Sequence, residues 1–277
     1  MSTFSPEWLG LREGADARAR NNAVADAVSA RFQLRDCVSV LDLGCGAGAN
    51  LRATSRLLPS QQTWTLVDLD AELLAHAKTV LSSWADTAEP DGENLALTKG
   101  RTEIRVRFRQ ADLARDLGDV IGEGADLVTA SAFFDLVSPD FIRSLARAAA
   151  EKRAAIYAVL TYNGVQRWSP HRPADNQISS AFNHHQMRDK GIGLAAGPMA
   201  AAHLADQFRL NGYTVNEGDS RWRLGSADRM LIDELVRGYA MAAAETGLVD
   251  QKSVEAWIKV TRGGAEIGHT DIFAAPT

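Results

Sequence analysis

Val40-Leu-Asp-Leu-Gly-Cys-Gly-Ala-Gly-Ala-Asn50 is the stretch of this 277-residue sequence that decides the fold. It reads as a short buried strand that runs into a glycine-rich turn and then into the start of a helix. Glycines let a chain turn tightly and bring backbone N–H groups against a ligand, because no Cβ stands in the way. Asp68 ends the next expected strand, which is where a carboxylate meets ribose hydroxyls in Rossmann nucleoside sites.

Strands and helices alternate outward from this stretch as far as residue 161. We expect strands at 38–43, 63–68, 103–110, 125–130 and 154–161, and helices at 49–58, 71–84 and 139–150. The polar residues 86–100 are interpreted as a surface loop. Such alternation predicts an α/β fold with a doubly wound, mostly parallel sheet, whose ligand crevice lies at the carboxyl ends of the strands.

The flanks of this core follow a different pattern. Residues 7–33 read as one charged, alanine-rich cover helix, and the alternation breaks after Tyr162. Beyond it we expect helices at 177–188, 198–210 and 254–260, strands at 213–217 and 265–274, and a long helix capped by Ser226 and closed by Gly247. We therefore predict a single domain over 1–277, with a helical cover at 1–36, a cofactor-binding core at 37–161, and an acceptor-side half with helical insertions at 162–277.

The composition points to a cytoplasmic protein that acts on a small molecule. Two cysteines exclude a disulfide framework, residues 1–10 lack the features of a signal peptide, and no apolar run approaches a membrane span. The net charge of −5 disfavours nucleic acid as a partner. The arginines at 105, 107 and 109 alternate along a strand and are interpreted as its solvated face.

Four segments, in order and together spanning 38–161, resemble motifs of class I S-adenosylmethionine-dependent methyltransferases. They are Leu41-Asp-Leu-Gly-Cys-Gly-Ala-Gly48, Val67-Asp-Leu-Asp70 with the helix that follows, Gln110-Ala-Asp-Leu113, and Asp126-Leu-Val-Thr-Ala-Ser-Ala-Phe-Phe134. The segment 8–18 and stretches of the C-terminal half, at 181–186, 220–225 and 268–272, resemble an uncharacterised bacterial branch of this superfamily. The resemblance implies a Rossmann-like, seven-stranded sheet and S-adenosyl-L-methionine as the cofactor.

The resemblance also implies roles for single residues. The glycines would approach the methionine moiety while Asp42 holds its ammonium, Asp68 would accept the ribose hydroxyls, and Asp112 would accept from the adenine amine. Asp70 is interpreted instead as the N-cap of the next helix. The implied cofactor set is Asp42, Gly44, Cys45, Gly46, Gly48, Asn50, Asp68, Leu69, Ala111, Asp112, Leu113 and Ser131.

Methyl transfer is a direct displacement, so the protein mostly positions the two reactants. A general base is needed only where the nucleophile begins protonated. Strand-end logic places the acceptor pocket in the loops after the fourth and fifth strands and in the inserted helix. The substrate-binding candidates are Phe133, Phe134, Tyr162, Asn163, Arg188 and Trp222. The catalytic candidates are His184, His185 and Asp135.

Several alternatives stay open beside O- or N-methylation of a small molecule. Gly44-x-Gly46-x-x-Ala49 satisfies a relaxed dinucleotide fingerprint, which would suit an NAD(P)-dependent oxidoreductase, although Asp42 inside the strand disfavours it. A non-catalytic cofactor-binding protein is the third reading. Arg12 and Arg18 are candidates to close over the cofactor or acceptor. Adjacent histidines diverge on a helix, so we expect no metal site. The acceptor, the methylated atom and the oligomeric state, a homodimer included, are left undetermined.

Overall fold

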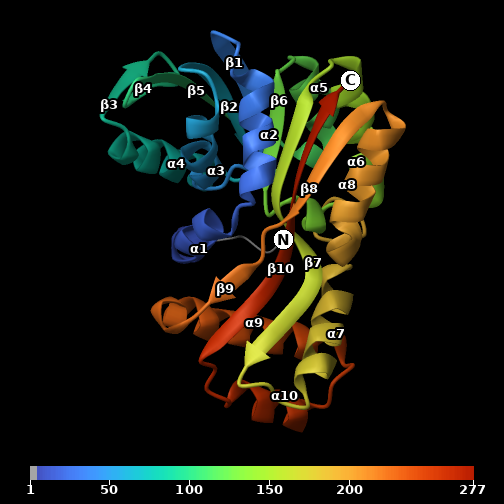
Figure 1. Ribbon diagram of the computed structural model, residues 1–277. Helices are drawn as coiled ribbons and strands as arrows, with labels where there is room; N and C mark the ends of the chain where they lie inside the picture. The colour runs from blue at the N-terminus through green and yellow to red at the C-terminus, as the bar shows by residue number, and fades with distance from the viewer. Residues whose placement is uncertain (1–4) are drawn as a thin grey trace.

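The computed structural model describes residues 5–277, and residues 1–4 of the expected cover segment lie outside it. A single sheet runs through the molecule (Figure 1) in the order β3-β4-β5-β2-β1-β6-β7-β10-β8, with β9 paired to β10. The parallel core consists of β5 (Thr102–Gln110), β2 (Gln61–Asp68), β1 (Cys37–Leu43), β6 (Leu127–Ser131) and β7 (Ala155–Ser169). The antiparallel strands β10 (Gly264–Pro276) and β8 (Tyr213–Asp219) complete the expected seven.

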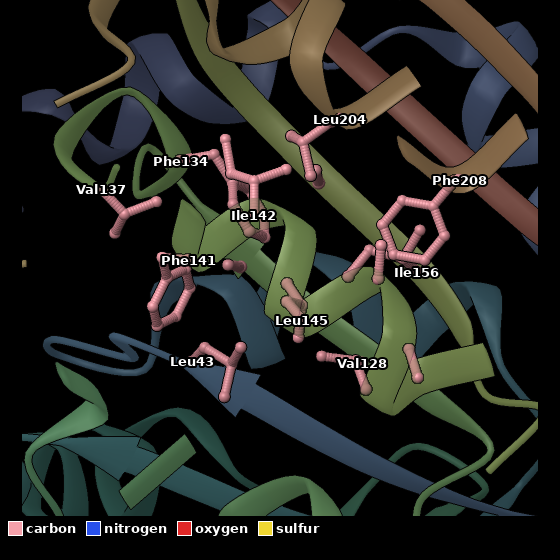
Figure 2. Close-up of a cluster of buried hydrophobic side chains, with 14 of the residues drawn as sticks. Leu43, Val128, Phe134, Val137, Phe141, Ile142, Leu145, Ile156, Leu204 and Phe208 are labelled. Atoms are coloured by element: carbon pink, nitrogen blue, oxygen red, sulfur yellow. The ribbon is translucent and has the colours of Figure 1, made fainter. Parts of the chain in front are cut away.

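Helices cover both faces of this sheet, which confirms the doubly wound α/β prediction. One face packs on α2 (Asn22–Phe32), α3 (Ala49–Thr54) and α4 (Ala71–Trp84). The other packs on α5 (Leu113–Gly122), α6 (Pro139–Glu151) and α8 (Ala200–Leu210). Figure 2 shows this second core, in which side chains of α6 and α8 meet those of β1, β6 and β7. These layers hold the carboxyl ends of β1, β2 and β6 in fixed positions.

The expected cover helix is two helices, α1 (Pro6–Ala19) and α2. The chain turns at Asn21, whose Oδ1 accepts a hydrogen bond from Val24 N and so caps α2. The backbone N–H of Asn21 donates to Asp271 Oδ2 at 2.8 Å. Capping by asparagine competes with a continuous helix. The prediction of one helix over 7–33 was therefore wrong at this residue.

The expected loop at 86–100 is a hairpin of β3 (Thr87–Asp91) and β4 (Asn94–Lys99), which adds two strands beside β5. Leu95 and Leu97 are buried in the core, while Asn94, Ala96 and Thr98, which alternate with them, are half-buried. Gly92 supplies the positive φ that the tight turn requires. The loop prediction was wrong because a one-sided strand has enough polar residues to resemble a loop.

β7 is much longer than the strand expected at 154–161. Its second half, residues 162–169, pairs antiparallel with the first half of β10, and together they form a two-stranded extension that we call the ribbon. The ribbon carries α7 (Asp175–Gln186), α9 (Arg229–Thr246) and α10 (Gln251–Ile258), which form a lobe below the main sheet (Figure 1). β9 (Trp222–Leu224) adds a third strand at its edge.

A buried ion pair holds the end of the lobe together. Arg262 Nη2 donates to Asp175 Oδ1 at 2.8 Å, and Trp257 Nε1 donates to the same oxygen at 2.7 Å. Ser226 does not cap the long helix, because residues 226–228 form a 3₁₀ turn and α9 begins at Arg229. Gly247 ends α9 in the left-handed conformation, as predicted. No helix of the described chain is long and apolar enough to cross a membrane.

Candidate active site

The glycine loop between β1 and α3 leaves no room for side chains. Gly44 and Gly46 have φ of +62° and +50°, a region that glycine adopts without strain. A Cβ on Gly44 would lie 2.7 Å from the Phe133 ring, and a Cβ on Gly46 would lie 3.1 Å from Leu9 of α1. The loop is therefore enclosed from both sides, with α1 lying across it.

Asp68 joins the end of β2 to this loop. Its Oδ2 accepts from Gly46 N at 2.9 Å, and its Oδ1 accepts from Asp70 N at 3.0 Å. Burial raises the pKa of Asp68, while these backbone N–H groups act in the opposite direction. Asp70 caps α4 by accepting from Glu72 N and Leu73 N, which confirms its predicted role.

Asp42 lies directly beneath the loop and is fully buried. Its Oδ1 accepts from Asn50 Nδ2 at 2.7 Å, while Oδ2 has no hydrogen-bond partner among residues 5–277. Burial raises the pKa of Asp42 to about 7, although the bond from Asn50 and the charge of Arg20 oppose the shift. An unpaired carboxylate oxygen in this position suits a cationic or hydrogen-donating ligand group.

The residues expected around an adenine ring lie beyond Asp68. The backbone N–H of Ala111 donates to Asp68 O at 3.0 Å, which ties the two strand ends together. Asp112 caps α5 by accepting from Ala114 N and forms an ion pair with Arg115. Leu113 is buried, whereas Leu69 is exposed.

A narrow cleft of about 130 Å³ separates the glycine loop from α1. Of the predicted cofactor residues, the cleft brings together Gly44, Cys45, Gly46, Asn50 and Ser131. The other predicted cofactor residues do not line it; they are Asp42, Gly48, Asp68, Leu69, Ala111, Asp112 and Leu113. The opposite wall is α1, which contributes Arg12, Glu13 and Asp16.

A larger cavity of about 500 Å³ lies on the other side of Arg12. Arg12 lines both hollows, and the consecutive residues Ser131 and Ala132 line one each. The cavity is enclosed by α1, the segment after β6, the ribbon, α7 and α9. Its lining includes Trp8, Arg12, Asp135, Tyr162, Phe182, His185, Gln186, Lys190, Trp222, Glu234, Leu235, Tyr239, Ile267 and His269. The two hollows are thus adjacent at the carboxyl ends of β1 and β6.

Aromatic rings form the walls of this cavity. Phe182 and Tyr239 stack with their centroids 3.8 Å apart, and Tyr162 meets Phe182 edge-on at 5.7 Å. On the other side, Trp222 lies 5.0 Å from the His269 ring. Packed rings of this kind form a rigid apolar surface.

The α1 wall is fixed by a polar cluster. Arg12 pairs with Asp16 at 2.9 Å, and Trp222 Nε1 donates to Asp16 Oδ1 at 3.0 Å. The guanidinium of Arg12 lies over the Trp222 ring at 5.3 Å. Arg18, the other arginine expected to close over a ligand, pairs with Asp228 instead.

Three buried polar atoms among the cavity-lining residues have no partner within the described chain. They are Asp135 Oδ1, Gln186 Oε1 and His269 Nδ1. Burial raises the pKa of Asp135 to about 6, even though the charges of Arg12 and Lys190 act to lower it. Burial, with Arg12 nearby, lowers the pKa of His269 to about 3, so its imidazole is neutral.

Four predicted acceptor-side residues line the cavity: Asp135, His185, Tyr162 and Trp222. Asp135 sits in a short 3₁₀ turn after β6, and His185 lies on α7, where its Nε2 pairs with Glu245. The hydroxyl of Tyr162 donates to Asn183 Oδ1 at 2.6 Å and accepts from Gln166 Nε2 at 2.5 Å. That hydroxyl is therefore already paired.

The other five predicted residues point elsewhere, so these predictions depart from the structure. Phe134 lies in the core with Ile142 and Leu204 (Figure 2). Phe133 packs on Gly44 rather than on the cavity.

The remaining three lie on the ribbon and on α7 or just after it. Asn163 Nδ2 donates to Thr270 Oγ1 across the ribbon. Arg188 Nη2 donates to the backbone oxygen of Glu245, and His184 lies on the exposed face of α7. Without knowledge of the ribbon, the sequence did not show which side of β7 and of α7 faces the cavity.

Sequence reasoning missed His269, Lys190 and Tyr239 as cavity residues, whereas Gln186 had been expected there as part of the inserted helix. The one signal for His269 was its place in the expected strand 265–274, which also contains the ionisable residues Glu266 and Asp271. Tyr239 was read as core, and it is fully buried. Within residues 5–277, no three histidine, cysteine, aspartate or glutamate side chains are grouped as ligands of a metal would be.

The comparisons with known proteins concern the same region. Residues 40–152 match a family that is described as methyltransferase domain. The matched segment runs from β1 to α6 and includes the glycine loop and Asp68. This match confirms the resemblance over that segment. No curated protein matches the chain.

Solved structures resemble the whole chain only distantly. A cyclopropane synthase from Mycobacterium tuberculosis has a TM-score of 0.49 at 13% identity, covering 91% of this chain and 83% of that one. A methyltransferase from Thiobacillus denitrificans in complex with S-adenosyl-L-homocysteine has 0.46 at 16%, covering 98% and 99%. A magnesium protoporphyrin IX methyltransferase from Synechocystis, with bound S-adenosylmethionine, has 0.46 at 11%, covering 100% and 86%. Likeness at this level assigns no activity to the present chain.

Proposed function

Because residues 40–152 carry a methyltransferase domain, we propose that this protein is an enzyme that transfers a methyl group from S-adenosyl-L-methionine to a small molecule. The observation that carries the proposal is the adjacency of two hollows of different character. The narrow cleft lies on the glycine loop, and the aromatic cavity lies beside it, with Arg12 lining both.

The residues around the cleft fit the cofactor chemically. Asp42 offers an unpaired buried oxygen to an ammonium group, and ionisation of its carboxyl on binding would complete the charge pair. Asp68 stands at the end of β2 with lone pairs left to accept ribose hydroxyls. Asp112, with Ala111 and Leu113 beside it, is the proposed contact of the adenine ring. Gly44 and Gly46 supply the positive φ of the turn and let Phe133 and Leu9 pack directly on the loop, which holds its backbone in place beside the cleft.

When bound, the sulfonium group supplies a methyl carbon that is already activated toward displacement. The chain then has to hold the two reactants in line and keep water out, which is a large part of the barrier lowering in such reactions. Helix α1 and Arg12 separate and cover the two hollows, and the stacked rings of Phe182 and Tyr239 fix the far wall. We propose that four residues of the aromatic cavity contact the acceptor: Asp135, His185, Tyr162 and Trp222.

Calorimetric titration of S-adenosyl-L-homocysteine tests the proposal. We expect micromolar binding to the wild type and at least tenfold weaker binding to Asp68→Ala, a loss of about 1.4 kcal/mol. Asp70→Ala is the matched control, since this neighbouring carboxylate accepts hydrogen bonds from the first turn of α4; its affinity should stay within threefold. NADH is titrated in parallel. Binding of NADH, or no binding of S-adenosyl-L-homocysteine, would refute the proposed function.

A further inference from the structure

We propose that the methyl acceptor is a planar aromatic molecule bearing a hydroxyl group, and that Asp135 takes the hydroxyl proton as the methyl group is transferred. The inference rests on the proposed function and deepens it, because it assigns the aromatic cavity a substrate class and a catalytic residue. Its argument uses the shape, the unpaired atoms and the charges of the cavity.

The shape of the cavity favours a flat ring system. Stacked Phe182 and Tyr239 form one wall, and Trp222 with His269 lies on another. The volume of about 500 Å³ accommodates a molecule of two or three fused rings. Aromatic walls bind a planar guest through burial and through stacked or edge-on ring contacts.

The unpaired atoms require the guest to donate hydrogen bonds. A carboxylate oxygen and an amide oxygen only accept, and Asp135 Oδ1 and Gln186 Oε1 are both buried without a donor among residues 5–277. Buried acceptors that lack a donor destabilise a protein, and they are usually satisfied by a ligand or by water. A hydroxyl-bearing guest supplies the missing donor, whereas its methyl ether does not.

Charged and titratable groups face Asp135 from every element around it. Arg12 comes from α1, Lys190 from the segment after α7, Tyr162 from β7 and Tyr239 from α9. His185, His269 and Glu234 also line the cavity, and Glu234 is paired with Arg237. The two cations keep Asp135 partly ionised in spite of its burial. An additional carboxylate in the guest would meet a buried anion, which disfavours an acid as the acceptor.

Of these groups, Asp135 is best suited to act as the base. His269 is a weak base because burial lowers its pKa to about 3. The hydroxyl of Tyr162 is already paired on both sides, and burial raises the pKa of Tyr239 well above its usual range. His185 is engaged at both ring nitrogens, at Nε2 by Glu245 and at Nδ1 by Lys190 Nζ at 3.5 Å. With a pKa of about 6, the Asp135 carboxyl is largely ionised at neutral pH, and its Oδ1 has no donor among residues 5–277.

The step balances as follows. The hydroxyl oxygen forms a bond to the methyl carbon while the carbon–sulfur bond breaks and leaves its electron pair on sulfur. The O–H bond breaks at the same time, and its proton goes to Asp135 Oδ1. The products are a methyl ether and a neutral thioether. Asp135, whose pKa is about 6, then releases the proton to solvent at neutral pH.

The test compares matched ligands on three proteins with S-adenosyl-L-homocysteine present. The probes are phenol, 2-naphthol and 4-phenylphenol, each with its methyl ether and its carboxylate analogue. The proteins are the wild type, Asp135→Asn, and the control Asp140→Asn, which changes an exposed carboxylate nearby. We expect the wild type and the control to bind at least one hydroxyarene tenfold more tightly than its ether and its acid. Asp135→Asn should reduce that preference below threefold.

Turnover of the best hydroxyarene gives a second readout. Wild-type kcat should fall as the pH drops below about 6, because Asp135 is then protonated, and Asp135→Asn should lower kcat by 10²-fold or more, in the range typical of a lost general base. No hydroxyl preference in the wild type, or an equal preference in Asp135→Asn, overturns the inference. Affinity for S-adenosyl-L-homocysteine should not change in Asp135→Asn. Absence of that affinity from the wild type would instead refute the proposed function.

Discussion

Replacing Asp42 by asparagine should stabilise the protein, and by an amount that depends on pH. Burial raises the pKa of this carboxyl from 3.8 to about 7. A raised pKa favours the folded protein while the group is protonated, and the benefit is lost as the pH rises from the unfolded value toward the folded one. Above pH 7 the wild type therefore carries the full cost of a buried charge, whereas asparagine carries none.

The size of the effect follows from the same two values. The free energy of unfolding of Asp42→Asn relative to that of the wild type should rise by about 2–3 kcal/mol between pH 5 and pH 8. Asparagine retains an oxygen to accept from Asn50 Nδ2, so the packing is preserved. Urea denaturation at the two pH values measures both differences. A gain that is equal at both values, or a loss of stability at pH 8, would refute the electrostatic reasoning.

Three further substitutions test the packing that supports the site. Arg262→Met leaves the Asp175 carboxylate buried without its cation, and we expect a loss of about 3–5 kcal/mol in urea denaturation, against less than about 1 kcal/mol for the exposed Arg167→Met; equal losses would contradict this. Gly44→Ala puts a Cβ 2.7 Å from the Phe133 ring at a φ of +62°, so affinity for S-adenosyl-L-homocysteine should fall at least tenfold by calorimetry, and unchanged affinity would show that the loop is not close to the ligand. Leu145→Ala removes a fully buried side chain of α6 and should cost about 3 kcal/mol, with no change in ligand affinity; a cost below about 1 kcal/mol would mean that the core in Figure 2 is loosely packed.

The cofactor-side half was predictable because its signals are local. The glycine turn lies between β1 and α3. Asp68, at the end of β2, and Asp70, which caps α4, lie within the next strand–turn–helix unit. The spacing of apolar residues and the positions of turn-forming residues predict such units well. The hairpin at 87–99 escaped because its apolar residues, Leu95 and Leu97, are few and its outer face is polar.

The aromatic cavity could be predicted only in part, because it is assembled from distant parts of the chain. The wall formed by Trp222 depends on Asp16 of α1, and the position of His269 depends on pairing with Tyr162 across the ribbon. Neither contact leaves a periodic trace in the sequence. Asp135 was found from its place after the fourth strand, but the sequence contains nothing that reports its burial or its raised pKa.

The ribbon also has a mechanical consequence. Two antiparallel strands resist stretching, because their hydrogen bonds act together, but they twist easily compared with a wide sheet that is packed on both faces. The lobe of α7, α9 and α10 is attached to the main sheet largely through the ribbon. A twist of the ribbon would move the Tyr239 wall of the lobe relative to Asp135, which follows β6 of the main sheet, while the hydrogen bonds of the parallel core stayed in place. The width of the aromatic cavity therefore depends on the twist of two paired strands.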